Sequence, residues 1–197
     1  MKPGRVILIT GLPGAGKSTL AHELARCYRL PLLAKDFIKE PLLDVLGAAD
    51  AAYSRKLSDA SFAVMFRLAA EWVAGGQDFI LEGNFRPAEH EGPLREVFTS
   101  ARGLQVLCRV PEAERLARLG DREKDPARHA GHRFGERQSA TPAAIGMNRS
   151  GDAFLDLPGE RLVHDAASHH TVLAALDDWM NLRAASPLAV PSSEPSR

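Results

Sequence analysis

Near its start the chain carries the stretch Gly11-Leu12-Pro13-Gly14-Ala15-Gly16-Lys17-Ser18, which fits the phosphate-binding pattern G-x-x-x-x-G-K-[ST] at every fixed position. The residues before it, Val6-Ile7-Leu8-Ile9-Thr10, form a β-branched apolar run that is typical of a buried strand. Residues 18–28 follow with the apolar spacing of a helix. Strand, glycine loop and helix in this order are the context that the pattern requires. We therefore interpret the stretch as a phosphate-binding loop rather than as a plain glycine turn.

This loop predicts the binding of a nucleoside triphosphate together with Mg²⁺. Its glycines let backbone N–H groups turn inward around phosphate oxygens, and the N-terminus of the following helix adds a partial positive charge. In this pattern the lysine, here Lys17, reaches the β- and γ-phosphates, and the hydroxyl of Ser18 binds the metal ion. The predicted nucleotide-binding residues are Gly11, Leu12, Pro13, Gly14, Ala15, Gly16, Lys17, Ser18 and Thr19.

The length and charge of the chain limit its class. At 197 residues it suits one domain with a sheet covered on both faces. Lysine plus arginine and aspartate plus glutamate both number 25, which gives zero formal net charge. This balance argues against capture of nucleic acid or of an anionic membrane by a broad basic surface. Because no apolar run approaches a membrane span and no signal peptide precedes the first strand, we expect a cytoplasmic protein.

The two cysteines, Cys27 and Cys108, fall within a predicted helix and a predicted strand and lack the spacing of metal ligands. Cys27 shares an apolar stripe of its helix with Leu20 and Leu24. We expect both cysteines to be buried small hydrophobic residues in a reduced compartment.

Apolar periodicity along the rest of the chain alternates between strands and helices. Further strands are predicted at 30–34, 79–81, 104–110 and 161–164, and helices at 37–46, 53–73, 89–100, 112–119 and 169–183. The core stripe expected on the 53–73 helix is Leu57, Ser61, Val64, Leu68 and Trp72. Gly75-Gly76 is interpreted as the turn that ends this helix, not as the signature loop of a transporter ATPase. The pattern indicates an α/β fold with a parallel sheet over residues 1–184 and a disordered tail at 185–197.

Three regions give the chain a resemblance to the small P-loop kinases that phosphorylate hydroxyl groups. They are the loop at 11–18, the stretch Lys35-Asp36-Phe37-Ile38-Lys39, and an arginine-rich segment that starts near Arg115. The resemblance covers about residues 4–183 and extends to the AAA_33 group, chloramphenicol phosphotransferase, gluconate kinase, the zeta toxins and phage polynucleotide kinase. It implies a five-stranded parallel sheet in the order 2-3-1-4-5, with ATP and Mg²⁺ as cofactors. The chain lacks the guanine-reading sequence Asn-Lys-x-Asp, which disfavours a GTPase switch.

Asp36 follows the second predicted strand, at the edge where open α/β sheets bind their ligands. The resemblance implies that this carboxylate accepts the proton of the attacking substrate hydroxyl, as in-line phosphoryl transfer needs. The alternative is that Asp36 caps the helix at 37–46. Lys39, one turn further on, either contacts an acidic group of the substrate or lies on a solvated helix face.

Glu82 follows the third strand, where P-loop proteins keep a second acid that holds the shell of the metal ion. Relatives often have aspartate there, so the longer Glu82 leaves direct and water-mediated contact with Mg²⁺ both open. A contact of Glu82 with the substrate is also possible, and a solvent-facing acid is the further alternative. Asn84 and Arg86 are candidate substrate contacts in the next loop, or only form the turn before Pro87.

An arginine-rich segment follows the fourth strand. The resemblance implies a lid at about 121–135 that brings arginines such as Arg115, Arg118 and Arg122 onto the phosphates, because planar guanidinium groups bind phosphate oxygens bidentately. The alternative is a surface helix with ion pairs to its own acidic residues. Arg128 belongs to a stretch that could instead read the substrate, and the pair His129 and His132 lacks the further ligands of a zinc site.

The stretch His164-Asp165-Ala166-Ala167 corresponds by position to the place where such kinases pack the adenine base, although an ordinary strand-to-helix connection explains it equally well. The first functional hypothesis is an ATP-dependent phosphotransferase that acts on a hydroxyl of a small molecule. The second is a kinase of the 5′-hydroxyl of nucleic-acid ends, which zero net charge disfavours. The third is a non-catalytic nucleotide-binding switch. The acceptor and the oligomeric state stay open.

Overall fold

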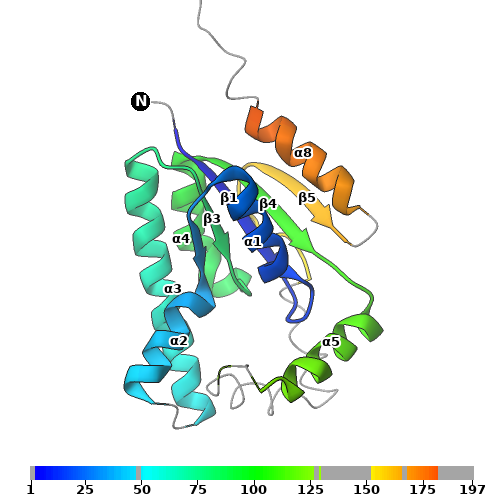
Figure 1. Cartoon of the computed structure of the whole chain (residues 1–197). Coiled ribbons are helices and arrows are strands. Elements are labelled where there is room, and N and C mark those ends of the chain that lie inside the picture. The colour runs from blue at the N-terminus through cyan, green and yellow to red at the C-terminus, as the bar shows by residue number, and fades with distance from the viewer. Residues whose placement is uncertain (1–2, 48–49, 127–128, 130–151, 166–167, 182–197) are drawn as a thin grey trace, which may run out of the picture.

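The computed structural model describes residues 3–47, 50–126, 129, 152–165 and 168–181. Its centre is a five-stranded sheet in the order β2-β3-β1-β4-β5, and every pair of neighbouring strands is parallel (Figure 1). The strands are β1 (Arg5–Gly11), β2 (Leu32–Ala34), β3 (Phe79–Glu82), β4 (Arg102–Cys108) and β5 (Glu160–His164). The α/β class and the predicted strand order are confirmed.

Helices cover both faces of the sheet (Figure 1). One face is covered by α3 (Ala51–Ala74) and α4 (Pro87–Ser100), and the other by α1 (Lys17–Tyr28) and α8 (His169–Asn181). The helices α2 (Lys35–Leu46) and α5 (Glu112–Lys124) lie beyond the carboxyl ends of the strands (Figure 1). No helix of the described ranges is both long and apolar enough to cross a membrane.

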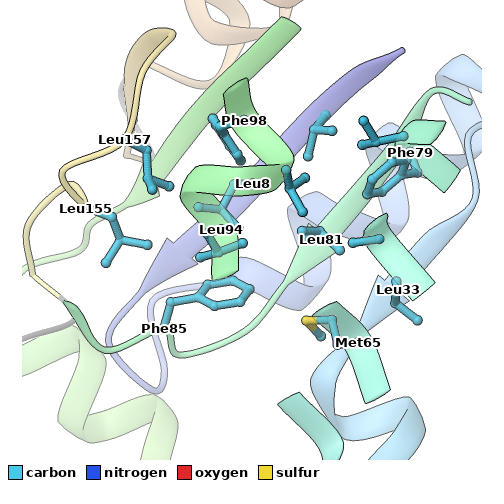
Figure 2. Close-up of a cluster of buried hydrophobic side chains, with 14 of the residues drawn as sticks. Leu8, Leu33, Met65, Phe79, Leu81, Phe85, Leu94, Phe98, Leu155 and Leu157 are labelled. Atoms are coloured by element: carbon cyan, nitrogen blue, oxygen red, sulfur yellow. The ribbon is translucent and has the colours of Figure 1, made fainter. Parts of the chain in front are cut away.

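The central strand β1 is buried on both faces, and its alternating side chains belong to two separate cores. Val6 and Leu8 pack with residues of α3 and α4, including Met65, Leu94 and Phe98 (Figure 2). Ile7 and Ile9 point the other way and pack with residues of α1 and α8, among them Leu20, Leu24, Val172, Leu176 and Trp179. Burial on both faces explains why β1 reads as a continuous apolar run instead of an alternating one.

The structure corrects the expected core stripe of α3. Val64 and Leu68 are 44% and 37% exposed, whereas Met65, Ala69 and Val73 are buried together with Leu57, Ser61 and Phe62. Two apolar stripes run side by side on this helix, and periodicity alone does not say which one faces the sheet. The face that packs on the sheet is the one next to Phe62, whose aromatic ring packs against Phe85 in the core.

Three further expectations were wrong in detail. Cys27 is exposed, while Cys108 is buried as expected. The fourth strand ends at Cys108 and not at residue 110. Helix α5 continues to Lys124, so the first residues of the predicted lid belong to its last turn. The rest of the lid, apart from 125, 126 and 129, and the predicted tail lie outside the described residues.

Candidate active site

The loop between β1 and α1 is held tightly against neighbouring backbone. Gly14 has a positive φ of 85°, and a Cβ atom there would lie 2.9 Å from the carbonyl oxygen of Arg115. Gly11 is confined in the same way by the carbonyl oxygen of Cys108, at 2.4 Å from the position of a Cβ. Both sites therefore require glycine, since a side chain would have to displace backbone of β4 or α5.

Lys17, the first residue of α1, lies buried behind this loop, and its Nζ donates a hydrogen bond to the carbonyl oxygen of Leu12 at 3.0 Å. Burial lowers the pKa of the ammonium group, and the nearby carboxyl of Glu82 acts in the opposite direction. A buried cation in the first turn of a helix, directly after this loop, provides the charge that a triphosphate needs.

Glu82 ends β3 beside the loop, because β3 pairs with β1 and places Glu82 opposite Ile9. Its side chain is only 5% exposed, and the Ser18 hydroxyl donates to its Oε2 at 3.5 Å. Burial raises the pKa of this carboxyl, while Lys17 lowers it. The solvent-facing alternative was therefore wrong.

The donors at this point fit a magnesium ion. A serine hydroxyl and a buried carboxylate are hard oxygen ligands, and Mg²⁺ usually takes one or two protein ligands and fills its shell with phosphate oxygens and water. Within the described residues no cluster of three or more His, Cys, Asp or Glu side chains could hold a metal by itself. Any ion bound between Ser18 and Glu82 would therefore depend on the nucleotide.

Asp36 follows β2, the strand next to β3, at the same edge of the sheet. Ala34 pairs with Glu82 across β2 and β3, and Asp36 is the second residue of α2 directly after that pair. Its carboxylate forms an ion pair with Lys35 and is about half exposed. The residue at the N-cap position of α2 is Ala34, without a side-chain cap, so the interpretation of Asp36 as the capping residue was wrong.

The other predicted acceptor-side residues have partners within the protein. Lys39 is buried and its Nζ donates to the Ser54 hydroxyl on α3 at 2.8 Å, which contradicts a solvated helix face. Arg86 pairs with Asp59 at 3.1 Å and also with Glu89. Asn84 is exposed in the loop that joins β3 to α4. The structure thus places Asn84 at the same sheet edge as Asp36 without showing a contact between them.

The three arginines of α5 differ in their surroundings. Arg115 is only 6% exposed, and its Nη1 donates to the carbonyl oxygen of Pro13 in the phosphate loop at 3.4 Å. Arg118 pairs with Glu114 on the helix surface, and its Nη1 lies near Gly16. Arg122 is exposed, and its charge contributes to the lowered pKa of Lys17. The interpretation of α5 as a surface helix with its own ion pairs fits Arg118. Arg115 instead is buried and holds the phosphate loop through its hydrogen bond to Pro13.

A cavity of about 560 Å³ lies beside the phosphate loop. Its walls come from the loop and α1, from the residues after β4, from the last turns of α5, and from two histidines at β5 and α8. The lining residues are Gly14, Ala15, Gly16, Thr19, Leu20, Glu23, Arg109, Val110, Arg118, Asp121, Arg122, Asp125, His164 and His169. This volume is in the usual range for a site that binds a small ligand.

Comparison with known proteins agrees with this fold. Residues 6–141 match the AAA_33 family, described as an AAA domain. The chain belongs to this AAA domain family. No curated protein matches its sequence.

Solved structures place this AAA domain among P-loop kinases. A provisionally assigned kinase from Chloroflexus aurantiacus J-10-fl is 30% identical, with a TM-score of 0.78 over 92% of this chain and 98% of the other. The APS kinase of Mycobacterium tuberculosis, solved with AMPPNP and APS, is 19% identical, with a TM-score of 0.54 over 91% and 99%. Shikimate kinase from Acinetobacter baumannii, solved with shikimate, is 14% identical, with a TM-score of 0.51 over 93% and 96%. At the last two identities the likeness concerns the fold alone.

Sequence reasoning on this AAA domain missed several cavity residues. Arg109 directly follows β4, and its guanidinium donates to the backbone of Asp152 at 2.7 Å. Its place after a parallel strand was the signal that could have identified it. Glu23 and His169 meet across 146 residues of sequence, and no local pattern predicts that.

Two of the predicted regions are only partly described. Arg128, His132 and the pair Ala166-Ala167 lie outside the described residues. His129 is described, and its Nε2 lies 2.9 Å from the carboxylate of Asp44 on α2.

Proposed function

We propose that this protein is an ATP-dependent, Mg²⁺-requiring phosphotransferase that acts on a hydroxyl group of a small molecule. One observation carries the proposal: β2 and β3 end side by side, so that Asp36 and the buried Glu82 lie at the same sheet edge as Lys17. The half-exposed carboxylate of Asp36 is the candidate to handle the acceptor, and that of Glu82 accepts from the hydroxyl of Ser18, the expected metal ligand.

In the proposed reaction the acceptor oxygen attacks the γ-phosphorus in line. The bond between that phosphorus and the β,γ-bridging oxygen breaks, ADP leaves, and the proton of the acceptor hydroxyl passes to the Asp36 carboxylate. Lys17 and the loop amides hold the phosphate charge throughout. A magnesium ion held by Ser18, with Glu82 in direct or water-mediated contact, would neutralise charge on the β- and γ-oxygens.

The charges around Asp36 support a small acceptor over a nucleic-acid end. Lys35 pairs with Asp36, and Arg86 pairs with both Asp59 and Glu89. Lys39 is buried against a serine hydroxyl. A site that tracks a nucleic-acid backbone usually presents a groove of available cations with stacking aromatic rings. Lys35, Lys39 and Arg86 instead have partners within the protein.

The test is transfer of label from γ-labelled ATP to three separate pools, namely metabolites, aminoglycoside- or phenicol-type antibiotics, and oligonucleotides with free 5′-hydroxyl ends. We expect Mg²⁺-dependent labelling in one of the small-molecule pools, and loss of that label in Lys17→Ala. Labelling of oligonucleotides would replace the proposal with the end-kinase alternative. Tight ATP binding without transfer to any pool would support a nucleotide-binding switch.

A further inference from the structure

Helix α5 is attached to the molecule differently from the helices that cover the sheet. Each of α1, α3, α4 and α8 contributes side chains to one of the two hydrophobic clusters, whereas neither cluster of the described chain contains a side chain of α5. Of the α5 side chains that the structure describes, only that of Arg115 is buried. Leu116, the next residue, is 41% exposed. A charged side chain therefore takes the place that apolar residues usually have on the docking face of a helix.

The face of α5 that carries Arg115 rests on the phosphate loop. Positions 115, 118, 119 and 122 lie three or four residues apart and so share one side of the helix. The carbonyl oxygen of Arg115 and Cγ of Leu119 lie 2.9 Å and 3.2 Å from the place of a Cβ atom on Gly14. Nη1 of Arg118 lies 3.5 Å from the corresponding place on Gly16. The loop is thus the surface on which this face of α5 packs.

The buried guanidinium of Arg115 lies outside the cavity and depends on the loop. Its Nη1 donates to the carbonyl oxygen of Pro13 at 3.4 Å, and its Nη2 lies 4.0 Å from the carboxylate of Glu112, which is largely exposed. A guanidinium is costly to bury unless other groups compensate its charge. Arg115 is not among the residues that line the cavity, so phosphates on the loop would compensate this charge without touching it.

Two other arginines of α5 do line the cavity, namely Arg118 and Arg122. The pKa of Lys17 is lowered mainly by burial, and the charge of Arg122 contributes to the same shift. One helix therefore presents two cations to the cavity beside the loop and a third to the outside of the loop. Because α5 is nearly rigid over two turns, the place of the first two depends on the contact that the third makes.

We propose that Arg115 is a positioning residue that couples phosphates on the loop to the position of α5, and thereby to Arg118 and Arg122. Negative charge on the loop strengthens the hold of the loop on the buried cation, which keeps the other two arginines at the cavity. Coupling of this kind is reciprocal, so a firmly held α5 also strengthens nucleotide binding. The inference rests on the proposed function, because it takes the loop to bind the phosphates of ATP.

Amide hydrogen exchange with and without Mg²⁺ and AMPPNP tests this coupling without knowledge of the acceptor. In the natural protein the nucleotide should slow exchange in the first turn of α1 and, by at least about fivefold, in α5. Arg115→Met keeps an apolar stem and removes both the charge and the donor. At saturating nucleotide this variant should still show slower exchange in the first turn of α1, but the slowing in α5 should be lost.

Nucleotide affinity gives a second measurement on the same proteins. Because the coupling is reciprocal, the dissociation constant of AMPPNP should rise in Arg115→Met by about the factor that exchange in α5 loses. Lys124→Met is the matched control, since it removes a cation from the last turn of α5 whose side chain is 81% exposed. It should behave like the natural protein in both measurements. If Arg115→Met does not fold, Arg115→Gln, which removes the charge and keeps a donor, takes its place with the same expected result.

The outcomes distinguish this inference from the proposed function. If AMPPNP does not bind the natural protein, the proposed function fails. If it slows exchange in the first turn of α1 but not in α5, the inference fails and the proposed function stands. The inference also fails if the slowing in α5 persists in the Arg115 variant, because a merely structural Arg115 changes exchange equally with and without nucleotide.

Discussion

On the nucleotide side of the sheet edge lies a glycine loop that is held by backbone contacts, whereas the acceptor side is built from paired side chains. The loop is fixed by contacts of Gly11 and Gly14 with the backbone of β4 and α5. The acceptor side depends on pairs such as Lys39 with Ser54 and Arg86 with Asp59. A backbone site tolerates few sequence changes, while paired side chains can be exchanged. The comparison explains why the sequence predicts the phosphate-binding loop and leaves the acceptor open.

Lys17→Ala gives the largest expected effect and tests the nucleotide side. The substitution removes the buried cation that balances phosphate charge, so phosphoryl transfer should fall by about 10³-fold or more, since electrostatic groups in a water-excluded site contribute several kcal/mol. Turnover with γ-labelled ATP is the measurement, and far-ultraviolet circular dichroism should show an intact fold. Near-normal turnover would contradict the interpretation of residues 11–18 as a phosphate-binding loop.

Asp36→Asn tests the acceptor side. If Asp36 accepts the proton of the acceptor hydroxyl, turnover should fall by about 10²–10⁴-fold with ATP affinity almost unchanged. The thermal midpoint should also stay close to that of the natural protein, because the cap of α2 is at Ala34. Asp178→Asn, an exposed residue on α8, is the matched control. Full activity of Asp36→Asn would contradict this role of Asp36, and Glu82 would be the next carboxylate to test.

Lowering the pH should destabilise the acceptor side, because His90 on α4 becomes protonated. Its Nδ1 accepts the backbone N–H of Arg86 at 2.8 Å, and its ring packs on Phe62 with the centroids 4.0 Å apart. Burial lowers the pKa of His90 from its usual 6.5 to about 4. The imidazole of His90 therefore binds a proton more readily in the unfolded chain than in the folded one. Its contribution to the free energy of unfolding is fully present above pH 6.5 and is lost as the pH falls towards 4.

The expected loss is about 2–3 kcal/mol across that window, since one pKa unit corresponds to about 1.4 kcal/mol. Urea unfolding at pH 7 and pH 4 measures it, with His90→Phe as the test variant and His170→Phe as the control. The pH dependence should shrink in His90→Phe and persist in His170→Phe. An equal pH dependence in all three proteins would contradict the role of His90.

Ser18→Ala should have the smallest effect of these changes, and it tests whether the nucleotide side binds a metal ion through this hydroxyl. The hydroxyl is one of the two oxygen donors that face the expected metal position, the other being the Glu82 carboxylate. Its loss should raise the Mg²⁺ concentration for half-maximal turnover by about tenfold, as expected when one hydrogen-bonding or ligating group worth about 1.4 kcal/mol is removed. Ser58→Ala on α3 is the control. An unchanged magnesium titration would count against Ser18 as a ligand.

The sheet and the loop were predictable because their signals are local. A β-branched run, a glycine pattern and alternating elements lie within short windows, and the strand order came from the resemblance to P-loop kinases. Asp36 and Glu82 could be placed because parallel strands share one carboxyl edge. Their proximity follows from topology and needs no knowledge of side-chain packing.

The rest depends on contacts between distant residues. The buried stripe of α3 was predicted only in part: Leu57 and Ser61 are buried as expected, but Val64 is exposed and Met65 is buried in its place. Val64 and Met65 are equally apolar, so the two faces differ only through packing such as that of Phe62 on Phe85. Likewise Cys27 is at a helical spacing that suits burial, yet it is exposed. Glu23, His169 and His164 contact one another in turn, although they come from α1, α8 and β5. No local sequence pattern predicts these contacts.

The close approach of Gly14 to Arg115 has a consequence for making chimaeras of related kinases. The carbonyl oxygen of Arg115 occupies the space where a side chain at position 14 would begin, and its guanidinium contacts Pro13. The loop at 11–18 and the first half of α5 therefore fit each other as one inherited unit, although about 100 residues separate them in sequence. In a recombined protein both segments must come from the same parent, or the distance between α5 and the sheet will be wrong for the loop.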